Sequence, residues 1–88
     1  MTQSRINNAF QSDDLQSLKR AVYGEVCLQA SRAHQHTSKE IDQRAAIDYV
    51  WRNLDAWLDT ADLTPIENPQ AFFRSAIRRL LREFIQFP

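Results

Sequence analysis

The sequence predicts an all-α fold: a small bundle of three helices within one domain that spans residues 1–88. A chain of 88 residues has the length of a single domain. It contains one glycine and three prolines, which is too few for the turns that a β-sheet protein needs. Its apolar residues also recur every three or four positions along three long segments, which is the spacing of one helix face.

The first predicted long helix runs from about residue 13 to residue 33. Ser12, Asp13 and Asp14 precede its first apolar residue and supply a capping oxygen and the negative charge that a helix N-terminus favours. Gly24 lies mid-helix, where it is either tolerated or admits the close approach of another backbone. The apolar stripe consists of Leu15, Leu18, Val22, Val26, Ala30 and Ala33.

Residues 1–11, ahead of this helix, leave two interpretations open. Ile6, Ala9 and Phe10 have the spacing of a helix face, which indicates a short helical turn. The segment is otherwise polar, which is equally typical of a flexible arm with Phe10 packed on the body of the domain.

The second predicted helix runs from about residue 38 to residue 60, and Thr37 and Glu40 have the spacing of a capping box before it. Its acidic edge carries Asp48, Asp55 and Asp59. Short connections on both sides predict roughly antiparallel neighbouring helices. The apolar stripe consists of Ala46, Ile47, Val50, Trp51, Leu54, Trp57, Leu58 and Ala61.

The third predicted helix runs from about residue 69 to residue 87, because Asn68 is a favourable cap and Pro69 suits the first helical position. On a wheel of about 100° per residue, its apolar residues cover roughly 220° of arc, about twice what one core-facing contact requires. The excess predicts burial against a second copy of the chain, against another protein, or beneath the N-terminal arm. The apolar residues are Phe72, Phe73, Ala76, Ile77, Leu80, Leu81, Phe84, Ile85 and Phe87.

The residues predicted to bind a partner protein lie on this third helix, because aromatic and arginine side chains commonly dominate binding energy at interfaces. They are Phe72, Phe73, Arg74, Arg78, Leu81, Arg82 and Ile85. In the alternative, Arg74, Arg78, Arg79 and Arg82 bind the phosphates of a nucleic acid. The net charge of zero disfavours nucleic acid as the main partner.

Charge is segregated along the chain, with a net −4 over residues 48–67 and a net +3 over residues 68–88. One interpretation is that the acidic second helix neutralises the arginine edge of the third helix across their seam. The other is that the arginine edge binds an external acidic partner. The sequence leaves both interpretations open.

No residue pattern predicts catalysis, a metal site or a cofactor. His34 and His36, two positions apart, point to different sides of a helix, and Cys27 has no base or cation at helical contact distance. A single cysteine excludes an internal disulfide and suggests a reducing compartment. No apolar run approaches the roughly 20 residues that span a bilayer, so we expect a cytoplasmic protein with no membrane partner.

Residues 50–55 and 67–80 resemble the second conserved region of extracytoplasmic-function sigma factors, within a likeness that covers about 30 of the 88 residues. The shared features are a tryptophan-containing segment, a short loop and an Asn-Pro helix start followed by aromatic, arginine and alanine positions. The resemblance implies a bacterial helical bundle that binds RNA polymerase or promoter DNA. Residues 39–43 match the family's acidic pattern only out of register, which favours a bundle reduced to protein binding.

Together these features predict a non-enzymatic helical interaction module, a small regulator or adaptor that forms homodimers and binds itself or another protein. The alternative is a transcription-linked protein that binds nucleic acid or RNA polymerase through a sigma-like bundle.

Overall fold

The computed structural model describes residues 5–12, 14–36 and 42–86, and within them the secondary structure is entirely helical. The helices are α1 (Arg5–Gln11), α2 (Leu15–His36), α3 (Gln43–Thr60) and α4 (Pro69–Gln86). The all-α fold class is therefore confirmed, whereas the predicted count of three helices is wrong. The additional helix is α1, so residues 5–11 form the short helical turn that was one of the two interpretations of the N-terminal segment, and residues 1–4 lie outside the described residues.

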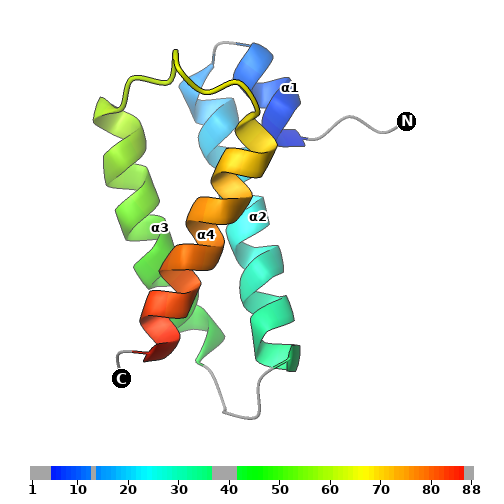
Figure 1. Cartoon of the computed structure of the whole chain (residues 1–88), viewed down its shortest axis with the longest axis vertical. Helices are drawn as coiled ribbons and strands as arrows, with labels where there is room; N and C mark the ends of the chain where they lie inside the picture. The colour runs from blue at the N-terminus through cyan, green and yellow to red at the C-terminus, as the bar shows by residue number, and fades with distance from the viewer. Residues whose placement is uncertain (1–4, 13, 37–41, 87–88) are drawn as a thin grey trace.

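The three long helices run up and down the molecule in succession (Figure 1). α2 and α3 are antiparallel, α3 and α4 are antiparallel, and α2 and α4 therefore run in the same direction. Short α1 lies at one end of the molecule, where it packs against both α2 and α4. The predicted antiparallel arrangement of neighbouring long helices is confirmed.

The core lies between the four helices and is formed by the predicted stripes. Leu18, Val22, Val26 and Ala30 come from α2, and Ala46, Val50, Leu54 and Leu58 come from α3. α4 adds Phe73, Ile77, Leu80 and Leu81, and α1 adds Ile6. Burial of these side chains is the main stabilising contribution to the fold.

α1 covers part of the unusually wide apolar arc of α4. Ile6 is 4% exposed and belongs to the core cluster that contains Phe73 and Ile77. The side-chain oxygen Oδ1 of Asn7 accepts a hydrogen bond of 3.1 Å from the backbone N–H of Gln70. This bond satisfies one of the N–H groups that a helix start leaves without a partner. The sequence allowed the wide apolar arc of α4 to be buried by a second copy, by another protein or by the N-terminal segment. In the single chain, the N-terminal segment buries part of it.

The start of α4 agrees with the sequence prediction. Asn68 Oδ1 accepts a hydrogen bond of 3.2 Å from the backbone N–H of Ala71, and Pro69 is the first helical residue. The predicted end at residue 87 lies outside the described residues. Asn68 and Pro69 therefore perform the capping and initiating roles that their chemistry favours.

The predicted ends of the other two long helices need correction. The start of α2 is capped by Asp14, whose Oδ1 accepts a 3.1 Å hydrogen bond from the backbone N–H of Gln16. Ser12, expected to cap α2, instead donates its hydroxyl to the carbonyl of Ala9 at the end of α1. α2 continues to His36, so the histidines belong to its last turn and not to the connection.

α3 begins at Gln43 and not near residue 38, because Asp42 has an extended backbone and is the N-cap. Asp42 Oδ1 accepts a 3.2 Å hydrogen bond from the backbone N–H of Ala45. The capping box predicted at Thr37 and Glu40 lies outside the described residues.

Candidate interaction surfaces

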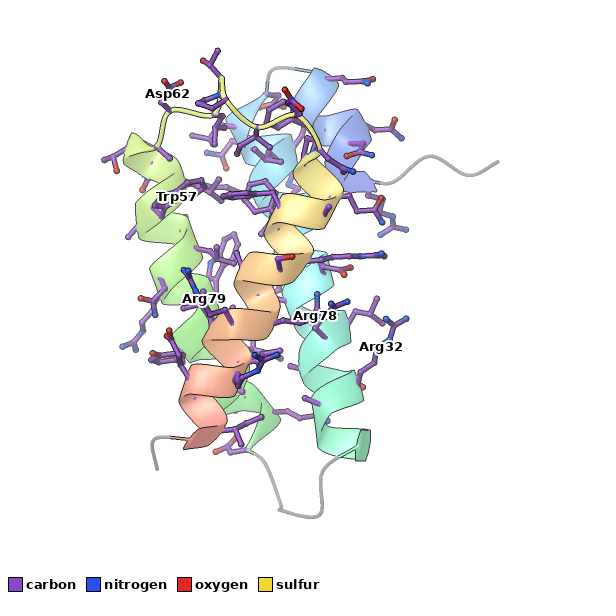
Figure 2. All side chains as sticks on the ribbon, viewed as in Figure 1. Arg32, Trp57, Asp62, Arg78 and Arg79 are labelled. Carbon is purple, nitrogen blue, oxygen red and sulfur yellow. The ribbon has the colours of Figure 1, made fainter. Side chains whose placement is uncertain are left out.

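The surface residues of α4 divide into two faces on opposite sides of the helix. Figure 2 shows Arg78 directed toward the α2 side and its neighbour Arg79 toward the α3 side. Consecutive residues of a helix point about 100° apart, so adjacent arginines serve different surfaces. We describe the two faces separately, because their chemistry differs.

A groove of about 360 Å³ lies between α2 and α4. We call it the cationic groove. α4 crosses the molecule diagonally, and its C-terminal half diverges from the C-terminal half of α2, the region in which much of the groove lies (Figure 1). Four arginines against one glutamate give the lining a formal charge of +3. The lining residues are Glu25, Gln29, Arg32 and Ala33 of α2 with Arg74, Arg78, Leu81, Arg82 and Ile85 of α4.

One end of the cationic groove is fixed by a small polar network. The Nε–H of Arg74 donates to Glu25 Oε1 at 2.9 Å, which also makes an ion pair between α4 and α2. The amide of buried Gln29 donates to the same Glu25 oxygen and to the backbone carbonyl of Arg74, both at 3.3 Å. These bonds position Arg74 and hold the two helices in register.

The rest of the groove carries positive charge without a counterion. Arg32, Arg78 and Arg82 are exposed, and no acidic side chain among the described residues forms an ion pair with any of them. Between these arginines, Leu81, Ile85 and Ala33 form an apolar floor. The groove therefore combines a hydrophobic base with a cationic rim.

The opposite side of α4 meets α3 and exposes aromatic rings. Tyr49, Trp57 and Phe72, which we call the aromatic face, are each 37–40% exposed. The rings of Trp57 and Phe72 are stacked, with centroids 5.6 Å apart and planes inclined by 28°. Tyr49 lies 5.6 Å from the half-buried ring of Phe84. The aromatic face thus consists of two ring pairs, each of which joins α3 to α4, and exposed aromatic residues are enriched at protein interaction surfaces.

The residues predicted to bind a partner are divided among three environments. Phe72 belongs to the aromatic face, whereas Arg74, Arg78, Arg82 and Ile85 line the cationic groove. Phe73 is fully buried in the core. Leu81 is only 5% exposed, at the floor of the groove. Neither residue is therefore an accessible anchor in this structure, because the single chain covers both.

Sequence reasoning missed the residues that complete each surface. Glu25, Gln29 and Arg32 join the groove only because α2 is rotated to present them to α4. Tyr49 and Trp57 join the aromatic face from α3. The sequence signals that could have indicated this face are the position of Trp57 at the edge of the predicted stripe and the position of Tyr49 outside it.

The acidic edge of α3 does not neutralise the arginines of α4. Within the described residues, Asp55 and Asp59 pair with Lys19 of α2 at 2.8 and 2.6 Å, and Asp48 pairs with Arg52 of its own helix. Of the α4 arginines, Arg74 pairs with α2. The predicted neutralisation across the α3–α4 seam is therefore wrong for the described residues, because none of these ion pairs joins α3 to α4.

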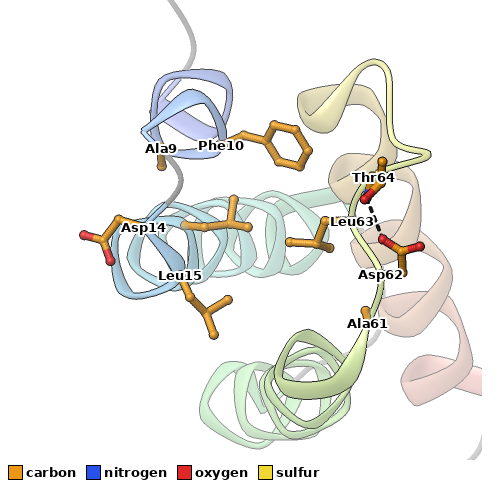
Figure 3. Close-up of a pocket in the computed structure, with 9 residues that line it drawn as sticks. Ala9, Phe10, Asp14, Leu15, Ala61, Asp62, Leu63 and Thr64 are labelled. Carbon is orange, nitrogen blue, oxygen red and sulfur yellow. Dashed lines mark hydrogen bonds between the residues drawn. The ribbon is translucent and has the colours of Figure 1, made fainter.

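A hollow of about 440 Å³ lies at the end of the molecule, between the α1–α2 corner and the α3–α4 connection (Figure 3). Phe10 and Leu63 project into it, while the carboxylates of Asp14 and Asp62 lie at opposite edges and point away. The hydroxyl and backbone N–H of Thr64 lower the pKa of Asp62 below its ordinary value. The Ser17 hydroxyl does the same for the pKa of Asp14. Both are thus carboxylates at neutral pH, the opposite of what a general acid needs.

Other candidate chemistry has little support in the described part of the chain. No group of three or more His, Cys, Asp and Glu side chains there has the arrangement of a metal site. Cys27 is a half-buried free thiol. None of the four helices, over the residues described, combines the length and apolar character required to cross a membrane.

Comparisons with protein-family models, with curated proteins and with solved structures find no match to this chain. The resemblance to extracytoplasmic-function sigma factors therefore stays a prediction. The two surfaces of α4 have to be interpreted from their own chemistry.

Proposed function

We propose that the chain is a non-enzymatic helical interaction module, a cytoplasmic regulator or adaptor that forms homodimers through its aromatic face. The observation that carries the proposal is the cluster of exposed rings at Tyr49, Trp57 and Phe72. A small domain gains stability when such rings are buried by self-association. The function is then to present α4 to partners from a paired scaffold.

The charge around the aromatic face also favours a second copy as its occupant. On α4, Phe72, Ala76, Arg79 and Glu83 follow one another at intervals of three or four residues, so they share one stripe. The stripe carries one positive and one negative residue, and its net charge is zero. Two copies related by a two-fold axis present the same patch to each other, so a neutral patch avoids repulsion. The cationic groove lacks this property, because two copies would place like charges together.

Light scattering coupled to size-exclusion chromatography tests the dimer over a range of protein concentrations. We expect a mass that rises from monomer to dimer before high micromolar concentration. Phe72→Glu places a carboxylate within the face and should hold the protein in the monomeric state, as should Tyr49→Glu. Leu28→Glu is the matched control, since Leu28 is exposed to a similar degree on α2 and lies outside the face.

A wild-type chain that stays monomeric at high micromolar concentration would contradict the homodimer. Equal effects of Leu28→Glu and Phe72→Glu would show that added charge, and not the face, decides the mass. Circular dichroism of each variant separates a lost interface from a lost fold.

A second candidate function is a transcription-linked protein that binds nucleic acid or RNA polymerase, as the sigma-factor resemblance implies. The exposed Arg32, Arg78 and Arg82 favour it, because arginine suits bidentate phosphate contacts. Fluorescence anisotropy with labelled DNA and RNA at low salt tests this candidate, and binding should weaken steeply as salt is added. No binding at low salt would exclude the nucleic-acid version, and a pull-down that lacks polymerase would exclude the other.

A further inference from the structure

We propose that the cationic groove binds an acidic amphipathic helix from a partner protein. The inference goes beyond homodimer formation, because the groove and the aromatic face lie on opposite sides of α4 (Figure 2). A dimer formed through one face leaves the other open. The argument rests on the shape of the groove, on its charge and on the exclusion of other occupants.

The groove has the layered chemistry that an amphipathic helix requires. Leu81, Ile85 and Ala33 line it, and α2 and α4, which run in the same direction and diverge toward their C-termini, form its walls. Apolar side chains spaced along one face of a bound helix would pack on this floor, as in other helix-in-groove complexes. The floor is contributed by both walls, so a bound helix would bridge α2 and α4.

The rim sets the charge and the spacing of the bound helix. Arg78 and Arg82 are four residues apart on α4, and four residues of an α-helix rise about 6 Å along the axis. Two acidic residues at positions i and i+4 of a partner helix have the same separation. Arg32 lies on the other wall, and Figure 2 shows its side chain on the side of α2 that is away from α4. The groove thus selects a helix with acids along the edge of its apolar stripe that meets Arg78 and Arg82.

Other occupants fit the groove less well. A second copy of the groove would repeat the charge of +3, which makes pairing groove to groove unfavourable. Nucleic acid presents phosphates and no apolar stripe, so it would leave the floor unused and meet the carboxylate of Glu25 at one end. Glu25 is also the partner of Arg74, so the fixed end of the groove carries little free positive charge.

The test uses a synthetic amphipathic peptide with a leucine stripe flanked by glutamates at i and i+4, about 18 residues long so that it forms a stable helix on binding. Isothermal titration calorimetry with the full chain measures its affinity. Two further peptides are a scrambled sequence of the same composition and a version with lysine in place of glutamate. We expect the first peptide to bind and the other two to bind at least about tenfold more weakly.

Variants then locate the site. Arg78→Ala should weaken peptide binding, and the further change Arg82→Ala should bring the loss to about tenfold or more. Arg79→Ala is the matched control for Arg78→Ala, because each removes one positive charge from α4 and the two side chains lie on different sides of the helix. Ile85→Gln should also weaken binding, because it makes the floor polar. The monomeric Phe72→Glu variant should bind the peptide as the wild type does. A wrong groove proposal can therefore be distinguished from a wrong homodimer proposal.

Three results would overturn the proposal. One is no binding of the acidic peptide, and another is equal binding of the scrambled sequence, which would mean attraction by charge alone. The third is an equal loss in the Arg79→Ala control. Tight binding of RNA or DNA that depends on Arg78 and Arg82, with no peptide binding, would assign the groove to nucleic acid instead.

Discussion

The rings of Phe72 and Phe73 meet edge to face, with centroids 5.2 Å apart and planes at 90°, although one ring is exposed and the other is not. Phe73 is 0% exposed and Phe72 is 40% exposed. The ring of Trp57 stacks on Phe72, and it meets Phe73 edge to face with ring centroids 6.2 Å apart. The aromatic face is therefore continuous with the core, which fixes the position of its rings.

The two phenylalanines should respond very differently to truncation. We expect Phe73→Ala to lower the free energy of unfolding by about 3–5 kcal/mol, because it opens a cavity in the core. Phe72→Ala should cost about 1 kcal/mol in the monomer, the usual range for a partly exposed residue. Urea denaturation at one low protein concentration measures both, and equal losses would contradict the assigned burial.

The α1 helix should contribute to stability through one residue. Ile6→Ala removes the side chain that α1 buries in the core, and we expect a loss of about 2–4 kcal/mol in the free energy of unfolding. Asn8→Ala on the same helix is the control, because Asn8 is exposed. A loss for Ile6→Ala no larger than that of the control would mean that α1 is not docked in solution.

Gly24 should be replaceable with a gain in stability. α2 runs through this position without a break, and a Cβ added there would meet no neighbouring atom within 4 Å. Among the described residues of the single chain, no second backbone approaches Gly24, which agrees with the interpretation of Gly24 as merely tolerated. We expect Gly24→Ala to raise the free energy of unfolding by about 0.5–1 kcal/mol, measured by thermal or urea denaturation. A destabilised variant would reveal a contact at this site in the assembled protein.

The ion pairs of Lys19 should make stability depend on alkaline pH. Hydrogen bonds from its ammonium to Asp55 and Asp59 raise the pKa of Lys19 above its ordinary value of 10.5. Because the pKa of Lys19 is higher in the folded state than in the unfolded state, the ion pairs contribute their full stabilisation at pH values below the pKa of the unfolded state. It is lost as pH rises through the folded pKa. The variant Lys19→Met keeps the apolar stem and removes the charge, so the wild type should be the more stable protein at neutral pH.

Thermal denaturation between about pH 9 and about pH 12 should show the difference between wild type and Lys19→Met shrink as pH rises. The control is Arg52→Met, which breaks the exposed pair with Asp48. An arginine does not titrate in this range, so the control difference should not follow the Lys19 pattern. A difference at Lys19 that is independent of pH would contradict the ion pairs.

Periodicity and capping chemistry predicted the long helices, since Asn68 and Pro69 begin α4 where expected. Competing caps explain two errors at helix starts. Asp14 and Asp42 accept the capping hydrogen bonds in the structure, whereas the caps predicted from the sequence are Ser12 and Thr37. α1 escaped a firm prediction because its seven residues provide only two turns of apolar spacing.

The surfaces were harder to predict than the helices. A wheel places Leu81 on the apolar side of α4, but whether a neighbour covers it depends on where α2 lies. The ion pair between Arg74 and Glu25 depends on the relative rotation of α2 and α4. The spacing of residues within either helix does not determine that rotation. Net charge along the chain likewise suggested a pairing of α3 with α4 that the fold does not make.

The bond between Asn7 and Gln70 joins positions 63 residues apart, and it has a consequence for synthesis of the protein. On the ribosome, the segment that forms α1 emerges before its docking partner α4. Until α4 is translated, Ile6 can pack only against α2. The nascent chain therefore exposes apolar surface to which chaperones can bind. The docking of α1 is therefore expected to be completed only after α4 has been synthesised.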